Sequence, residues 1–329
     1  MKTKPRTVFK IGIGLVGVLC LFFLGGYLYL MIGFPKVGSP PEIKIELTKA
    51  RIERGKYLAN HVALCIDCHS ERNWKQYAGP IIPGTEGKGG EHFGSNMGLP
   101  GEFYAANITP FHLGKWTDGE LLQAITEGIN KKREPLFPIM PYPNFRHLSR
   151  EDAYSIIAYL RTLKPISFTV PKRKIYFPMN LIIRTMPQPA KLKEKTPDPT
   201  DKIAYGKYIV TIASCAECHT PKEKGKPIPG MEFAGGVEFH LPDGTLVRSA
   251  NITPDKETGI GNMSKKTFID LFKSYAPENL KKTKFPKKHN TIMPWIMYAG
   301  MTKQDLGAIY EYLRTIKPVK NKVSKWKEE

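Results

Sequence analysis

Two short stretches of the sequence hold the residues best suited to chemistry. Residues 65–69 read CIDCH and residues 215–219 read CAECH, so four of the five cysteines lie in two identical frames that end in histidine. A C-x-x-C pair serves three chemistries: zinc ligation, thiol–disulfide exchange and covalent attachment of haem. The rest of the sequence has to distinguish among these.

Zinc ligation and thiol exchange explain the two frames poorly. Structural zinc takes four ligands, yet the pairs lie 150 residues apart in sequence, and no H-x3–5-H pair follows either one. Thiol exchange favours a βαβ context, which the sequence does not indicate. A structural disulfide would leave the histidine unexplained.

Covalent haem attachment uses every residue of the frame. Each cysteine adds to one vinyl group of the porphyrin, and the histidine that follows lies beneath the iron as an axial ligand. We therefore predict two covalently bound haem c groups. The predicted attachment residues are Cys65, Cys68, Cys215 and Cys218, and the predicted axial histidines are His69 and His219.

The second axial ligands are predicted to be Met140 and Met293. They follow the histidines of the two frames by 71 and 74 residues and lie in a repeated Ile-Met-Pro sequence. Three prolines around Met140 keep it out of a helix and stiffen its loop, and Pro294 does part of this for Met293. Most methionines are apolar filler, but the repetition favours ligation. Met297 is a rival that the first repeat does not mirror.

The remaining histidines have no consistent place across the repeat, and we expect surface or hydrogen-bonding roles for them. They are His61, His92, His112, His147, His240 and His289. Asn107 and Asn251 open a repeated Asn-Ile-Thr-Pro segment, in which the Thr-Pro pair forbids helix. The glycosylation sequon there is a weak signal. We expect each asparagine to hydrogen-bond its own loop or a haem propionate.

Both frames belong to a longer internal repeat. RGKYL at 54–58 returns as YGKYI at 205–209, and YLRTLKP at 159–165 returns as YLRTIKP at 312–318. Landmarks in the same order predict two copies of one domain. The expected divisions are an N-terminal anchor (1–35), a first domain (48–165), a proline-rich basic connector (166–199), a second domain (200–318) and a polar tail (319–329).

Helical signals dominate each copy. A first helix carries RGKYL or YGKYI towards the CxxCH frame, and a last helix starts after Ser149 or Thr302. A middle helix begins at Thr117 with capping-box spacing, ends near Gly128, and has a counterpart capped by Ser264. Because alternating strand segments are absent, the predicted fold class is all-α.

The N-terminus predicts a membrane anchor. Four basic residues precede an uncharged run of 24 residues from Ile11 to Phe34, which is long enough to cross a bilayer. The run is longer than the apolar centre of a cleaved signal peptide, and Cys20 within it is expected to be a small apolar residue of a membrane helix. The basic residues, Lys2, Lys4, Arg6 and Lys10, favour a cytoplasmic N-terminus and an extracytoplasmic body.

The formal charge of +20 suits an acidic protein partner or an anionic membrane surface. The basic residues are spread widely and no nucleic-acid fold motif occurs, so nucleic acid is not expected as a partner.

With these residues in hand, the chain resembles the dihaem cytochrome c family. More closely, it is similar to the cytochrome c subunits of bacterial membrane-bound alcohol, gluconate and sorbitol dehydrogenases. The likeness covers nearly everything after residue 48. It rests on CHTPKEKGK at 218–226, FAGGVEF at 233–239, NITPDKETGIG at 251–261, IMPY at 139–142, YLRTLKP at 159–165 and YFPMNLIIR at 176–184.

The resemblance implies two tandem class I cytochrome c folds, with the first and last helices of each crossing over the haem. The chain departs from the family pattern in two ways: a third haem domain is absent, and Asn-Ile-Thr-Pro at 107–110 is followed by Phe111-His112 instead of an acidic turn.

Filled axial positions predict an electron-transfer protein with no catalytic residues. We expect single electrons to pass from a periplasmic or membrane redox enzyme to a downstream acceptor, with the protein on the periplasmic side of the bacterial inner membrane. The alternative is a dihaem peroxidase or another small-molecule oxidoreductase with one open haem. Glu278 and His289, near the second methionine loop, keep that alternative open. A redox-sensing or assembly role would need a signalling module, which the sequence lacks.

Overall fold

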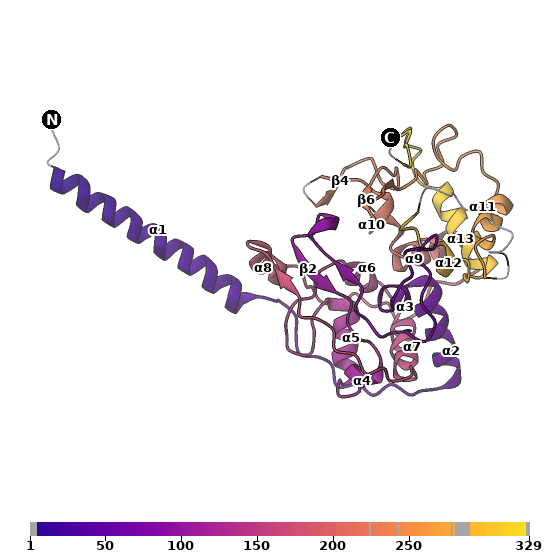
Figure 1. The fold of residues 1–329 in the computed structure, drawn as a ribbon, viewed down its shortest axis with the longest axis horizontal. Helices are drawn as coiled ribbons and strands as arrows, with labels where there is room; N and C mark the ends of the chain where they lie inside the picture. The colour runs from indigo at the N-terminus through magenta and orange to yellow at the C-terminus, as the bar shows by residue number, and fades with distance from the viewer. Residues whose placement is uncertain (1–4, 224, 242–243, 278, 280–289, 327–329) are drawn as a thin grey trace.

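The computed structural model describes residues 5–223, 225–241, 244–277, 279 and 290–326. Its most prominent feature is α1 (Pro5–Gly33), which projects away from a body formed by the rest of the chain (Figure 1). Residues Phe9–Gly33 are mostly apolar, and the apolar 18-residue window within them has no residue buried in the body. At 1.5 Å per residue these 25 residues reach about 37 Å, which exceeds a hydrocarbon core of roughly 30 Å. Lys2 and Lys4 lie outside the described residues.

The first repeat is built from short helices that follow its predicted caps. They are α2 (Lys49–Tyr57), the π-turn η1 (Leu58–Val62), α3 (Cys65–Cys68), α4 (Pro110–Leu113), α5 (Asp118–Glu127), α6 (Tyr142–Phe145) and α7 (Arg150–Arg161). The capping box of α5 is present, because Thr117 accepts from the backbone of Glu120 and the Glu120 carboxylate accepts from the N–H of Thr117. Gly128 closes α5 with φ 75°, as predicted.

The second repeat has the corresponding helices. They are α9 (Lys202–Ile212), α10 (Cys215–His219), α11 (Lys265–Lys273), α12 (Trp295–Tyr298) and α13 (Lys303–Arg314). The predicted caps are confirmed, since the side chains of Ser264, Thr302 and, in the first repeat, Ser149 accept from the backbone three residues on. The last helix of each repeat ends four residues before the proline that was expected to stop it.

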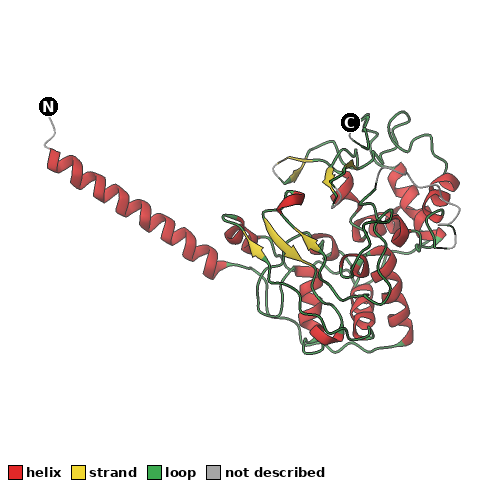
Figure 2. Cartoon of the chain, viewed as in Figure 1, coloured by secondary structure: helices red, strands yellow, loops and turns green. Residues whose placement is uncertain are grey.

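Short antiparallel strands complete the described part of the body (Figure 2). They are β1 (His92–Phe93), β2 (Gly101–Tyr104), β3 (Lys174–Ile175), β4 (Lys222–Glu223), β5 (Lys226–Pro227), β6 (Glu238–His240) and β7 (Leu246–Arg248). β1, β2 and β3 form one sheet in that order, and β4–β5 and β6–β7 form two hairpins. The all-α prediction missed these strands, because two to four residues are too few to show an alternating pattern.

The first and last helices of each repeat cross at a glycine. A Cβ at Gly55 in α2 would lie 1.8 Å from the carbonyl oxygen of Ser155 in α7, and one at Gly206 in α9 would lie 2.0 Å from that of Ala308 in α13. The glycines of RGKYL and YGKYI therefore let two helix backbones touch. This places the helix that leads into each CxxCH frame firmly on its partner.

The contacts between the two repeats include a reciprocal pair of hydrogen bonds. Tyr57 of α2 donates its hydroxyl proton to Asp305 of α13, and Tyr208 of α9 donates to Asp152 of α7 at 2.6 Å. Tyr57 and Tyr208 are equivalent positions of the repeat, and so are Asp305 and Asp152. Both carboxylates are almost fully buried. Each repeat therefore supplies one tyrosine and one aspartate, and we call these four residues the tyrosine seam.

The same hydroxyls cap the last helices. The backbone N–H groups of Ser149 and Thr302 each donate to a seam tyrosine at 3.1 Å. The repeats differ in the second partner of the aspartate. Arg54 binds Asp152 through two hydrogen bonds of 2.8 and 2.9 Å, whereas Tyr205, its counterpart, gives Asp305 a neutral hydroxyl at 3.0 Å.

The connector runs back along the first repeat and reaches α1. β3 pairs with β2, with Ile175 opposite Gly101. The chain then forms α8 (Met179–Ile182) and the 3-10 turn η3 (Ile183–Thr185), both of which contact α1. Ile183 is buried, which fixes this segment to the body.

Candidate functional site

The two CxxCH frames have the same local structure. α3 starts at Cys65 and α10 at Cys215, and each follows a residue in the left-handed region, Leu64 with φ 55° and Ser214 with φ 57°. Cysteines three positions apart in one helical turn lie on the same side of it. Both thiols of each frame can therefore reach one edge of a single planar group.

The thiols are in surroundings that disfavour thiolate. Burial raises the pKa of Cys65, Cys68 and Cys215 to about 12 and that of Cys218 to about 11. Zinc ligation and thiol exchange both use thiolate. In the described residues, moreover, no three His, Cys, Asp or Glu side chains gather as a metal site.

Each frame histidine is held by one backbone carbonyl. The Nδ1 atom of His69 lies 2.7 Å from the carbonyl oxygen of Ala106, and Nδ1 of His219 lies 2.7 Å from that of Ala250. Because a carbonyl only accepts, Nδ1 carries the proton and the lone pair is on Nε2. Desolvation lowers the pKa of both histidines, so the imidazoles are neutral. A neutral ring with an oriented, unprotonated nitrogen is what a metal ligand requires.

The Asn-Ile-Thr-Pro loops hold those carbonyls in place. In the first repeat, the Asn107 amide donates to the carbonyls of Ile166 and Phe168 at 2.9 and 3.1 Å, and its oxygen accepts from the N–H and hydroxyl of Thr109 at 3.0 and 2.7 Å. Asn107 is 2% exposed. Its amide is committed to the loop, which decides between the two roles expected from the sequence.

The second repeat has the same loop. Asn251 donates to the carbonyl of Val319 at 2.8 Å and to the hydroxyl of Thr258 at 3.0 Å, and it accepts from Thr253 at 2.9 and 2.8 Å. Each asparagine directly follows the alanine whose carbonyl accepts from the histidine, and it ties this part of the backbone to the segment beyond the last helix of its repeat.

A glycine in each repeat also supports the histidine, and sequence reasoning missed both. The N–H groups of Gly89 and Gly235 donate to the carbonyls of His69 and His219, both at 2.8 Å. A Cβ there would lie about 2.5 Å from the backbone of the alanine that holds the ring, and both glycines have φ near 75°. The signal was available, because a Gly-Gly pair recurs at 89–90 and 235–236 between the two motifs.

The two methionine loops share one backbone form. Met140 and Met293 are half-buried, and both pack against the hydrophobic core, as Cys65 and Cys215 do. The proline after each methionine has φ near −80° and ψ of 46° or 59°, and it starts a one-turn helix, α6 or α12. Met297 instead lies within α12, where its carbonyl oxygen is 2.9 Å from Nδ1 of His61.

One hydrogen bond and two buried hydroxyls without a partner bear on whether these loops fit a prosthetic group. Tyr298 in α12 donates to the carbonyl of Ala213, two residues before Cys215, at 2.8 Å, so the second methionine loop is tied to its own CxxCH frame. In the first repeat Tyr142, two residues after Met140, is fully buried, yet its hydroxyl has no partner among the described residues. The hydroxyl of Ser214, beside Cys215, is likewise buried without one. Each of these hydroxyls lies within two residues of a predicted haem-binding residue, which fits a haem with polar propionates.

Two of the other described histidines have hydrogen-bond partners outside the frames. His61 lies at the seam, and Nε2 of His92 is 2.6 Å from Glu102. Glu278 and His289, on which the peroxidase alternative depended, lie outside the described residues.

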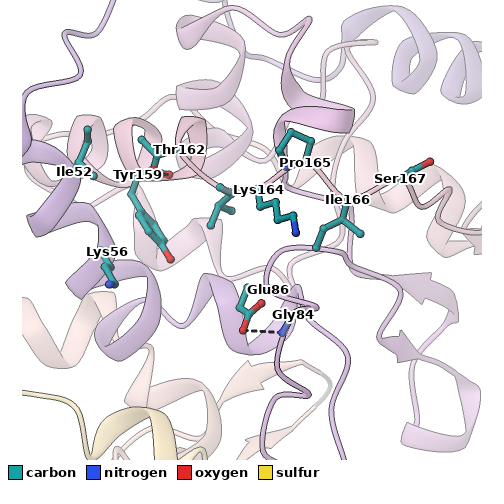
Figure 3. Close-up of a pocket in the computed structure, with 11 residues that line it drawn as sticks. Ile52, Lys56, Gly84, Glu86, Tyr159, Thr162, Lys164, Pro165, Ile166 and Ser167 are labelled. Carbon is teal, nitrogen blue, oxygen red and sulfur yellow. Dashed lines mark hydrogen bonds between the residues drawn. The ribbon is translucent and has the colours of Figure 1, made fainter.

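A separate surface hollow of about 750 Å³ lies where α2 meets the segment after α7 (Figure 3). Lys56, Tyr159 and Lys164 line it together with Glu86, whose carboxylate accepts from the N–H of Gly84. None of the eight residues predicted to hold haem lines it.

Comparisons with known proteins show which proteins the chain is similar to. The model of the cytochrome c family matches residues 203–317. The chain is 30% identical over 286 residues to the cytochrome c subunit of alcohol dehydrogenase (quinone) from Gluconacetobacter polyoxogenes, covering 82% of this chain and 57% of that protein. It is 29% identical over 278 residues to the fructose dehydrogenase cytochrome subunit of Gluconobacter japonicus, covering 80% and 52%.

A third relative is the diheme cytochrome c-type protein of Cereibacter sphaeroides, which is 28% identical over 249 residues, covering 72% of this chain and 78% of that one. The chain spans just over half the length of the dehydrogenase subunits that it matches.

Proposed function

The chain contains a cytochrome c domain and resembles the cytochrome c subunits of bacterial dehydrogenases, and from this premise we propose that it is a membrane-anchored dihaem cytochrome. In this role it relays single electrons between a periplasmic or membrane redox enzyme and a downstream acceptor. It is a subunit or partner of a dehydrogenase and has no catalytic residues of its own.

The observation that carries the proposal is the repeated support of the two histidines. His69 and His219 are each bound through Nδ1 to an alanine carbonyl at 2.7 Å. A single haem would require only one such site. The proposed organisation is two tandem cytochrome c domains, residues 48–165 and 200–318, each with one haem c. Cys65 and Cys68 hold the first haem, and Cys215 and Cys218 hold the second.

The proposed iron ligands are His69 with Met140 in the first repeat and His219 with Met293 in the second. When bound, haem c supplies a one-electron couple. The imidazoles are neutral and oriented before binding, so little reorganisation is needed. A thioether is a soft, neutral donor that favours the reduced metal and raises the potential. With four side chains in the four axial positions, no position is left for a substrate.

The partners follow from charge and from the relatives. The net charge of +20 speeds docking with an acidic protein surface. Several relatives are named as subunits of alcohol, fructose and gluconate dehydrogenases, so an enzyme of this kind is the proposed electron donor. α1 holds the protein in the inner membrane with the haem domains on the periplasmic side.

A haem count and a carbon monoxide titration test the proposal. The full-length protein, purified with its haem, should contain two haem c per chain by the pyridine haemochrome assay. After dithionite reduction, the Soret band should not respond to carbon monoxide at neutral pH, because every iron has two side-chain ligands. One haem per chain would reject the dihaem organisation. Carbon monoxide binding at half of the haem would instead favour the oxidoreductase alternative.

A further inference from the structure

The connector presents an apolar edge to the surroundings of the body. Phe177 is 80% exposed, Ile182 43% and Tyr176 38%. These residues lie in or just before α8, on the side of the body from which α1 departs (Figure 1). We call these three residues the connector edge. Phe177 is the most exposed large apolar side chain outside α1 in the described residues, and exposed apolar groups that lie together mark a contact surface.

The connector edge is fastened to the end of α1. Arg184, at the end of the connector turn, donates to the carbonyl oxygens of Leu30, Met31 and Phe34 at 3.0, 2.9 and 2.6 Å. The last carbonyls of a helix have no partner within the helix, and a cation at this end also interacts favourably with the helix dipole. The connector edge therefore lies beside the last turn of α1, at about the same height along the axis of that helix.

The edge is also fixed to the body. β3 pairs with β2, the N–H of Tyr176 donates to the carbonyl of Pro100 at 3.0 Å, and the Tyr176 hydroxyl donates to Glu102 at 2.8 Å. The connector edge cannot swing independently of the first repeat. It therefore links the direction of α1 to the orientation of the body.

The chemistry of this region is that of a membrane–water boundary. Tyr27 and Tyr29 lie exposed near the end of α1. The ammonium group of Lys36 lies 5.0 Å above the ring of Phe34, and that of Lys174 lies 5.6 Å above the ring of Tyr176. Aromatic rings with basic side chains beside them are typical of the interfacial layer at the end of a membrane-spanning helix.

We propose that the connector edge lies in the headgroup layer of the membrane that α1 crosses, so that the body touches the lipid at a second point and has one orientation on the membrane. This inference rests on the proposed anchoring by α1. A lipid surface is favoured over a protein partner because the edge is fastened to the end of the spanning helix. A bilayer crossed by α1 necessarily lies against it.

Spin labelling of the full-length, haem-loaded protein in phosphatidylcholine–phosphatidylglycerol vesicles tests this inference. With the CxxCH cysteines bound to haem, Cys20 in α1 is the remaining thiol and reports on the anchor. In a Cys20→Ser background, Ile182→Cys and Phe177→Cys report on the connector edge. Leu271→Cys is the matched control, because it is exposed in α11 (Figure 1), which lies across the body from α1. Power saturation then compares access of oxygen, which enters lipid, with access of a water-soluble nickel chelate.

The label at Cys20 should favour oxygen, the label at Leu271 should favour nickel, and the labels at Ile182 and Phe177 should give an oxygen-to-nickel ratio between these two. A lipid-exposed Cys20 label with aqueous labels at Ile182 and Phe177 would overturn the inference and leave the anchoring intact. An aqueous Cys20 label would overturn the anchoring and the inference with it. Labels on the connector edge that are shielded from both reagents would show that protein covers it, which would also overturn the inference. The electron-relay proposal is tested separately by the haem count.

Discussion

Replacing Asn107 with alanine should destabilise the first repeat by about 2–4 kcal/mol. Thr109, whose N–H and hydroxyl both donate to Asn107, is fully buried. The Thr109 N–H, left as a buried donor without an acceptor, costs about 1–3 kcal/mol, whereas the Thr109 hydroxyl can rotate towards another acceptor. The carbonyls of Ile166 and Phe168 are only half-buried, so water replaces part of what they lose. Their two hydrogen bonds account for about 0.5–1.5 kcal/mol each at most.

Urea unfolding of the detergent-solubilised, haem-loaded protein measures this loss. For an m-value of about 2 kcal/mol/M, the urea midpoint of the first-repeat transition should fall by roughly 1–2 M. Far-UV and Soret circular dichroism are the signals that record this transition. Amide exchange should accelerate at Thr109. The matched control is Asn144→Ala, which removes one surface hydrogen bond of 3.3 Å to Glu217. If Asn107→Ala shifts the midpoint no further than this control, the loop does not provide the support described.

Three further results are expected. The seam predicts a double-mutant coupling of about 1.5–3 kcal/mol between Tyr57→Phe and Asp305→Asn, because a hydrogen bond to a buried carboxylate is strong; a coupling near zero in urea unfolding would contradict it. In the dithionite-reduced protein, Met140→Ala and Met293→Ala should each open half of the haem to carbon monoxide in a Soret titration, and a silent variant would reject that ligand. Hydrogen bonds from Tyr176, Ser95 and His92 lower the pKa of Glu102 from 4.5 to about 2, so its stabilisation is present above pH 4.5 and lost as pH falls towards 2. The urea midpoint of Glu102→Gln should therefore be lower than that of the wild type at pH 7 and equal to it near pH 2. A difference in midpoint that persists at pH 2 would argue against this.

The sequence predicted features that depend on residue type and spacing. Helix caps such as Thr117 were predictable because a hydroxyl just before a helix accepts a hydrogen bond from a backbone N–H of the first turn. The one-turn geometry of Cys65 and Cys68 follows from their spacing of three. The support of His69 by Ala106 was not predictable, because every residue has a carbonyl and the alanine side chain gives no signal.

Contacts between distant segments were also beyond sequence patterns. Tyr57 and Asp305 are 248 residues apart, and nothing in the local sequence of either one indicates the other. The short strands were missed for a different reason, since β3 has two residues and owes its extended form to its neighbour β2. Long-range pairing decided the conformation there, because a segment of two residues is too short for its local propensity to show a strand.

The tyrosine seam has the symmetry of a homodimer within one chain. Tyr57 meets Asp305 and Tyr208 meets Asp152, so each contact occurs twice with the roles of the repeats exchanged, as in subunits related by a twofold axis. Two separate copies would need enough interface to find and hold each other from dilute solution. A covalent connector instead keeps the partners at an effective concentration in about the millimolar range. The seam therefore needs to add little affinity, and its hydroxyl groups help to set the angle between the repeats together with the apolar core that both repeats share.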